Sequence, residues 1–262
     1  MRYRALAATP AILVLATLVA WAVSPGAARV TVLTAAVEAA KVLAMAGCIL
    51  AASAFEPGEY MRRAWALLGA CTLLLFARDI VALANGPAAA QGLLAIVGNG
   101  SSVAGTWMLA RAWTVAGLAE EDRPAGRVAV LAGAAALALV VTGGPLLADV
   151  RALIGGHLLA IVPFASDVAD AAVLILLAPL LQTTLALRGG ALRWPWALMT
   201  AGNLLWLLFD VVYAIEAAWG LPVGRGHFVT DSLRVLATAF LFSAGLAQRW
   251  AVLPQTRLEA VS

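Results

Sequence analysis

Residues 65–83 read WALLGACTLLLFARDIVAL, and this stretch decides the class of fold. Among its 19 residues, the only charged side chains are one arginine and one aspartate. A continuous apolar run of about 20 residues is what a helix needs to cross a lipid bilayer. A membrane-spanning β-strand would instead come from segments of about ten residues with alternating hydrophobicity. The stretch therefore predicts a transmembrane helix that carries an acid and a base inside it.

The rest of the chain repeats this character. Of the 262 residues, 63% are hydrophobic and only 12% are charged, which leaves too little polar surface for a soluble domain. Turn-forming glycine, proline and asparagine residues separate the apolar runs. Eight spans are predicted, at residues 6–23, 30–54, 63–84, 92–118, 127–142, 164–187, 195–218 and 228–250. The sequence thus predicts an all-α protein, a polytopic membrane helix bundle with about eight transmembrane helices.

The arginines predict the orientation of this bundle. If the N-terminus lies in the cytoplasm, ten arginines fall at cytoplasmic ends and three in outer loops, as the positive-inside rule requires. Both termini are therefore expected to be cytoplasmic, and the expected location is the bacterial plasma (inner) membrane. A cleaved signal peptide in place of the first helix is the alternative, because Arg2 and Arg4 precede an apolar run. The net charge of +3 reflects this asymmetry and indicates no nucleic-acid partner.

An internal match suggests that the chain is a duplication. Residues 196–214, WALMTAGNLLWLLFDVVYA, match residues 65–83 without gaps at an offset of 131. The match pairs the leading tryptophans, and it pairs Asp79 with Asp210. Both residue types are scarce here, so these matches mean more than matches between leucines and alanines.

The neighbouring helices extend the match. At an offset of 132, Glu38 falls on Asp170. We therefore predict a tandem four-helix repeat, with copies at 1–122 and 123–262, related by a pseudo-twofold axis along the membrane normal. Accidental similarity between two segments rich in leucine and alanine is the alternative.

The second copy contains an insert at about 145–161. Its apolar side chains fall on one helical face, with Asp149 and Arg151 opposite. This pattern predicts a short helix in the outer membrane interface, with a re-entrant segment as the alternative.

The charges inside the spans are the candidate functional residues, because an ionisable group in a membrane is costly without a partner or water. Nearly all of them fall in the outer half of the predicted bundle. The candidate residues for ion binding or proton relay are Asp79, Asp210, Glu38 and Asp170. The predicted supporting charge pairs involve Lys41, Arg78, Asp231 and Arg234. This pattern predicts an acid-lined cavity that opens to the outer side, while buried salt bridges that only fix helix register are the alternative.

Metal and cofactor signals are weak. His157, His227 and Asp167 are the candidate metal ligands, since imidazole with carboxylate suits several metals. Neither histidine lies in the centre of a predicted helix, which argues against a buried haem. No cofactor is implied, and no residue is assigned a catalytic role.

The function favoured by these patterns is a cation- or proton-coupled transporter or a channel-like protein. The alternative is a non-catalytic membrane subunit that acts as a sensor, or as an assembly or anchoring partner in a larger complex. An intramembrane enzyme acting on a lipid is a third hypothesis. The expected partners are the lipid bilayer and either further copies of the chain or other members of a membrane complex.

Overall fold

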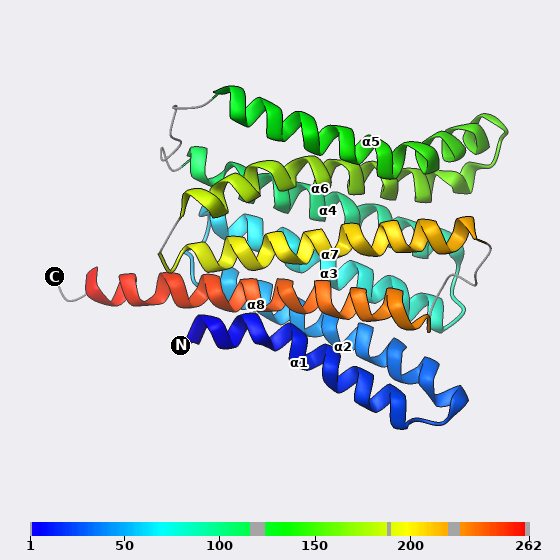
Figure 1. Cartoon of the computed structure of the whole chain (residues 1–262), viewed down its shortest axis with the longest axis horizontal. Helices are drawn as coiled ribbons and strands as arrows, with labels where there is room; N and C mark the ends of the chain where they lie inside the picture. Colours follow the sequence, from blue (N-terminus) through cyan, green and yellow to red (C-terminus); the bar gives the residue numbers. More distant parts are fainter. Residues whose placement is uncertain (1, 116–123, 188–189, 220–225, 260–262) are drawn as a thin grey trace. The chain divides into compact units, whose positions relative to one another are not determined.

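The chain folds into long helices, as a computed structural model shows (Figure 1). The structure describes residues 2–115, 124–187, 190–219 and 226–259, and it contains no strand within them. The helices are α1 (Arg2–Val23), α2 (Gly26–Ala52), α3 (Tyr60–Leu83), α4 (Ala88–Val115), α5 (Pro124–Ile154), α6 (Ile161–Ala186), α7 (Arg193–Ala218) and α8 (Phe228–Glu259), with a short 3₁₀ helix, η1 (Leu158–Ala160), before α6. Among the described residues, eight helices are long and apolar enough to cross a membrane, so the predicted all-α membrane bundle is confirmed. The last predicted residues of the fourth span, 116–118, lie outside the described residues.

The turn residues end these helices by satisfying the last backbone carbonyls. At the end of α3, Asn85 adopts a positive φ of 55°. The Gly86 N–H then donates to the Val81 carbonyl at 2.8 Å, and the Asn85 N–H donates to the Ala82 carbonyl at 3.1 Å. This is the Schellman arrangement, which closes a helix and reverses the chain without leaving buried acceptors unpaired.

One compact unit, called unit 1 here, consists of Met1–Ala54 and Leu187–Ser262 and holds α1, α2, α7 and α8. In it, α8 packs against α1, α2 and α7 (Figure 1). The backbones of α2 and α8 lie close together at two glycines: a Cβ on Gly245 would overlap the Gly47 carbonyl. Small residues permit this kind of close helix packing inside membranes.

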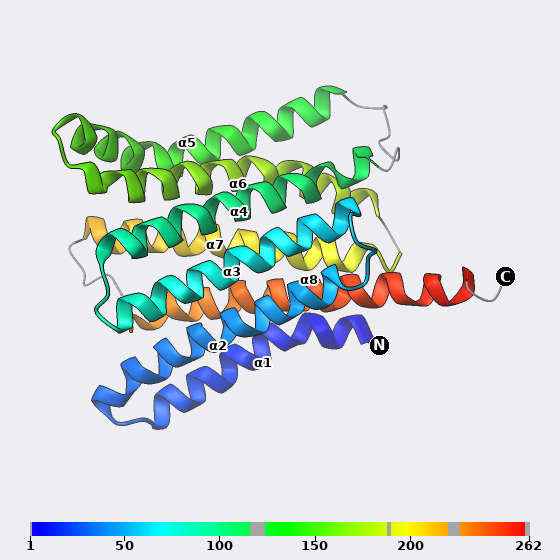
Figure 2. The same cartoon turned by 180° about the vertical axis from the view of Figure 1, so that it is seen from behind.

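The second compact unit, unit 2, consists of Phe55–Ala186 and holds α3 to α6. Here α4 packs against both α3 and α6, and α5 packs on α6 (Figure 2). The boundary between the two units does not coincide with the expected boundary near residue 122 between two repeat copies. Because the units describe packing and a repeat describes duplication, the repeat stays a prediction.

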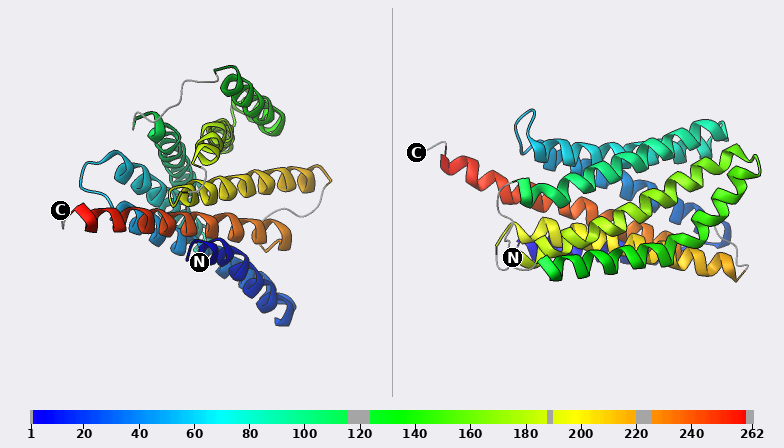
Figure 3. Two further views of the ribbon diagram at one scale, coloured as in Figure 1. Left: turned by 60° about the vertical axis from the view of Figure 1, so that its left-hand side comes forward. Right: turned by 90° about the horizontal axis from the view of Figure 1, so that it is seen from above.

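The structure differs from the sequence expectation at 145–161. Residues up to Ile154 continue α5 instead of forming a separate helix, and α5 and α6 run side by side (Figure 3). Pro145 lies inside α5. A proline removes one backbone hydrogen bond and bends a helix, but neighbouring helices allow membrane helices to continue through it. Whether the end of α5 lies at the membrane interface stays a prediction.

Apolar side chains cover the outward faces of the helices. On α5, Leu139 and Val140 are 70% and 81% exposed. Water would make such a surface prone to aggregation, whereas lipid tails solvate it. The exposed apolar faces and the eight spans together define a multi-pass membrane protein in a lipid bilayer.

Candidate ion-binding sites

In unit 1, the first predicted charge pair forms one turn apart on α2. The Lys41 ammonium donates to both carboxylate oxygens of Glu38, at 3.1 and 3.2 Å. Lys41 is only 5% exposed. A buried charge needs a hydrogen-bonded partner of opposite sign, and residues at i and i+3 on a helix lie close enough to supply one.

The second predicted pair of unit 1 lies in the first turns of α8. The Arg234 guanidinium donates to Asp231 Oδ1 at 3.0 Å, and the Gly226 N–H donates to Asp231 Oδ2 at 2.7 Å. Both carboxylate oxygens of buried Asp231 therefore accept a hydrogen bond. A carboxylate is also favoured here because the amino end of a helix carries partial positive charge.

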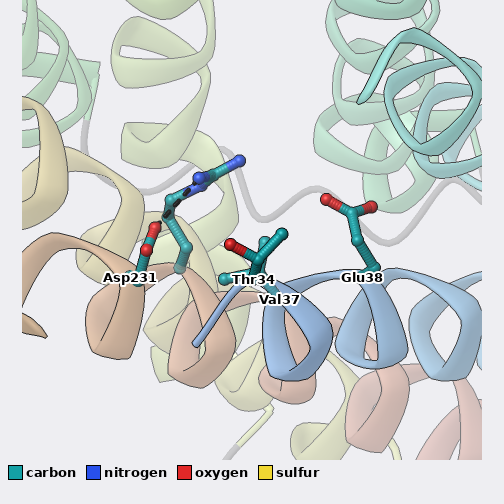
Figure 4. A pocket seen from close by; sticks show the side chains of 5 residues that line it. Thr34, Val37, Glu38 and Asp231 are labelled. Carbon is teal, nitrogen blue, oxygen red and sulfur yellow. Dashed lines mark hydrogen bonds and ion pairs between the residues drawn. The ribbon is translucent and has the colours of Figure 1, made fainter. Parts of the chain in front are cut away.

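Three members of these pairs, Glu38, Asp231 and Arg234, line a common pocket. Thr34, Val37 and Glu38 of α2 line it together with Asp231 and Arg234 of α8. Figure 4 shows Asp231 and Glu38 on opposite sides of Thr34 and Val37. The hollow is shallow, because the side chains that line it leave no room for a water molecule between them.

The predicted residue Asp210 lies on α7, so unit 1 brings it into the same packed set of helices as Glu38. It is partly buried. The preceding residue, Phe209, faces the charge network, because its ring centroid lies 6.0 Å from the Arg234 guanidinium carbon.

The candidate metal ligands separate. In unit 1, His227 Nδ1 lies 3.2 Å from Glu216 Oε2. Glu216 was not among the metal ligands predicted from the sequence. His157 is exposed in the turn before η1 of unit 2. The described residues hold no group of three or more histidine, cysteine, aspartate or glutamate side chains arranged for a metal ion.

In unit 2, α3 carries the pair noted in the opening stretch of sequence. The Arg78 guanidinium lies 2.7 Å from Asp79 Oδ1, and Asp79 is 2% exposed. This pair is formed by adjacent residues, so it needs no second helix to assemble.

Three further acids of unit 2 gather where α5 meets α6. The Asp167 carboxyl faces the Asp149 carboxyl closely enough to share a proton, and Asp170 interacts electrostatically with Asp167 from one turn further along α6. Asp149 Oδ2 is buried, and no donor reaches it. The structure gives none of these three acids an ion pair with a basic side chain among the described residues.

Sequence reasoning missed Asp149 because it placed that residue on a separate interfacial helix. The sequence spacing did contain an indication of this contact. Asp149 and Asp167 lie nine residues on either side of residue 158, so an antiparallel hairpin that turns there places them opposite each other.

A polar contact next to this cluster ties α4 to α6. The Asn99 side-chain amide donates to the Ser166 hydroxyl at 2.7 Å. Interhelical hydrogen bonds of this kind help to hold membrane helices together.

Packing and sites therefore describe a multi-pass membrane protein with ionisable groups inside its spans. Compared with known protein families, with curated proteins and with solved structures, the chain finds no match.

Proposed function

We propose that this membrane protein is a cation- or proton-coupled transporter or a channel-like protein, in which Asp79, Asp210, Glu38 and Asp170 bind or relay the ion. The observation that carries the proposal is the carboxyl cluster of α5 and α6, to which Asp170 belongs. Its acids lie in helices long enough to span a membrane, and no described basic side chain forms an ion pair with them.

Elementary electrostatics explains why such a cluster favours ion chemistry. Several like charges in a region of low dielectric constant repel one another strongly and lose their hydration. A proton shared between two carboxyls removes one charge, and a bound cation compensates one. Intramembrane carboxyls without a basic partner are therefore typical of proton and cation pathways.

The packing within the units supports treating the four acids as two copies of one arrangement. Each helix of the first expected copy, α1–α4, has a counterpart four helices later in the second, α5–α8. When every helix of unit 1 is replaced by its counterpart, the helices of unit 2 result. The same exchange turns the α7–α8 contact into α3–α4 and the α2–α8 contact into α6–α4. Each unit then holds one acid of each expected pair, Glu38 with Asp210 and Asp170 with Asp79. This agreement favours the tandem repeat. The excess of arginines at one set of helix ends favours cytoplasmic termini in a bacterial inner membrane.

Ion flux through the purified protein in proteoliposomes tests the proposal. An imposed membrane potential supplies the driving force, an enclosed pH dye reports protons, and sodium and potassium gradients are tested in turn. Asp170→Asn and Asp210→Asn are each expected to reduce the flux at least about tenfold, because a neutral amide cannot exchange the proton or cation charge. Glu56→Gln is the matched control, since Glu56 is an exposed acid between α2 and α3. Unchanged flux in both aspartate variants would remove these residues from the pathway.

A non-catalytic membrane subunit is the second candidate, and the ion pairs favour it. Glu38–Lys41, Arg78–Asp79 and Asp231–Arg234 satisfy their charges locally, as pairs that only fix helix register would do. Such a subunit would copurify with a stoichiometric partner from native membranes and would conduct no ion alone. Isolation without a partner, together with flux in liposomes, would exclude it.

A further inference from the structure

An arginine interrupts the apolar outer face of α4 in unit 2. At 3.6 residues per turn, one face of this helix carries the exposed side chains of Leu93, Val97, Trp107, Arg111 and Val115. Leu93 is 64% exposed and Val115 is 55% exposed, so apolar surface continues on both sides of the arginine. In a membrane protein such a face is covered by lipid. The charge of Arg111 therefore points toward lipid and away from the interior of unit 2.

The protein supplies no acceptor for this guanidinium. Arg111 forms no ion pair and no hydrogen bond among the residues that the structure describes. Tyr60 of α3 is near enough for an electrostatic interaction, but its buried hydroxyl finds no hydrogen-bond partner in the described part of the chain. The guanidinium carbon lies 4.9 Å from the centre of the Trp107 ring. This ring orients the positive group without neutralising it, so the N–H donors of Arg111 still need an anion.

The place of Arg111 along α4 indicates which anion it meets. The membrane span in this helix runs from Ala88 to Ala112, so Arg111 lies in its last turn. A long basic side chain at the end of a span reaches the level of the lipid headgroups, and tryptophans are enriched at the same level. The planar guanidinium also matches two oxygens of one phosphate. A headgroup phosphate thus has both the charge and the position that this face requires.

We propose that Arg111 and Trp107 form a binding site for the headgroup of one anionic phospholipid on the outer face of α4. The guanidinium donates to the phosphate oxygens, and the acyl chains lie along Val97 and Leu93. A zwitterionic lipid offers the same phosphate, but its own cationic group competes with the arginine, so a headgroup with net negative charge binds more tightly. With the expected cytoplasmic termini, this end of α4 reaches the cytoplasmic leaflet, which carries anionic lipid. The site does not depend on ion transport.

Lipid titration tests the proposal. The purified protein in detergent is titrated with phosphatidylglycerol, or with phosphatidylcholine that has the same acyl chains. Native mass spectrometry measures the bound lipid, and the melting temperature reports binding to the folded state. Arg111→Gln is expected to bind phosphatidylglycerol at least about fivefold more weakly than the wild type, which is the usual effect of one basic residue near a membrane surface. Its binding of phosphatidylcholine should change little.

Three further variants separate the site from general effects of charge. Arg111→Lys keeps the positive charge and should retain most of the preference for phosphatidylglycerol. Trp107→Leu keeps the apolar surface but removes the ring that orients the guanidinium, so it should lose part of the preference. Arg249→Gln is the matched control and should change nothing, because the Arg249 guanidinium already donates to the Leu50 carbonyl and the Ser53 hydroxyl.

Equal phosphatidylglycerol binding by the wild type and Arg111→Gln would overturn the proposal. Displacement of the lipid by millimolar inorganic phosphate would overturn the assignment to a lipid, because a free anion gains nothing from the apolar face. Failure to recover folded Arg111→Gln even in phosphatidylcholine would also overturn it, since an exposed guanidinium that only holds lipid is not needed for packing. A folded Arg111→Gln that loses the preference, with Arg249→Gln unchanged, would support the site.

Discussion

Unit 1 and unit 2 share part of their pattern of helix contacts, but their buried charges have different surroundings. In unit 1, the carboxylates of Glu38 and Asp231 each have a basic partner one turn away on the same helix. In unit 2, Asp79 pairs with the adjacent Arg78, whereas the cluster of Asp149, Asp167 and Asp170 has no ion pair to a basic residue that the structure describes. The comparison teaches that acids on these packed helices occur both with a basic partner on the same helix and in a cluster without an ion pair among the described residues. Under the proposed function, a proton or cation would bind at the cluster.

The largest effect is expected in unit 1, when the Glu38–Lys41 ion pair is broken. Lys41→Met should lower the free energy of unfolding by about 3–5 kcal/mol, because it leaves the Glu38 carboxylate without the ammonium that donates to both of its oxygens. Denaturant or thermal unfolding in detergent measures the loss. The double variant with Glu38→Gln should recover most of it, since both charges are then absent. A single variant as stable as the wild type would mean that this pair does not balance unit 1.

A smaller effect concerns the equivalent helix contacts of the two units. Gly245→Ala should destabilise the protein by roughly 1–3 kcal/mol, because the added Cβ meets the backbone of Gly47, which cannot move aside. Gly92→Ala in unit 2 is the matched variant: the nearest atoms to its Cβ belong to the Val162 side chain, not to the backbone of another helix. Unfolding measurements on both variants should give a clearly higher free energy of unfolding for Gly92→Ala than for Gly245→Ala. Equal losses would show that α2–α8 is no tighter than α4–α6.

The smallest expected effect has the opposite sign. Asp149→Asn in unit 2 should raise the free energy of unfolding by about 1 kcal/mol at neutral pH, because it removes a carboxyl that faces Asp167. The gain should shrink in acid, where the carboxyls of the wild type are protonated and no longer repel. Melting temperatures at several pH values measure it. Destabilisation at neutral pH would indicate that an unseen counter-charge already balances the cluster.

The sequence alone predicted most of the fold. Long apolar runs and their turn residues located all eight spans, because backbone groups in lipid must be satisfied within each helix. The pairs Glu38–Lys41 and Asp231–Arg234 were also predictable, since a spacing of three residues on one helix brings side chains together without any knowledge of tertiary packing.

Contacts between helices were less accessible to sequence reasoning. The meeting of Asp149 with Asp167 depends on α5 continuing through Pro145, whereas the sequence pattern suggested a break there. The pairing of His227 with Glu216 depends on how α7 and α8 pack, and hydropathy contains no information about that choice. Periodicity reports which face of a helix is apolar, but it does not report which helix that face meets.

The position of α8 in the chain has a consequence for biosynthesis. Unit 2 is continuous in sequence, but in unit 1 the helix α8, which packs against α1 and α2, is made only after all of unit 2. At about 5–20 residues per second, the ribosome needs roughly 10–35 seconds to extend the chain from the end of α2 to the start of α8. During that time, α1, α2 and later α7 lack the helix that packs against them. A nascent chain that stalls before Phe228 should therefore present unit 2 together with three helices of unit 1 that lack α8 and are open to quality-control proteases.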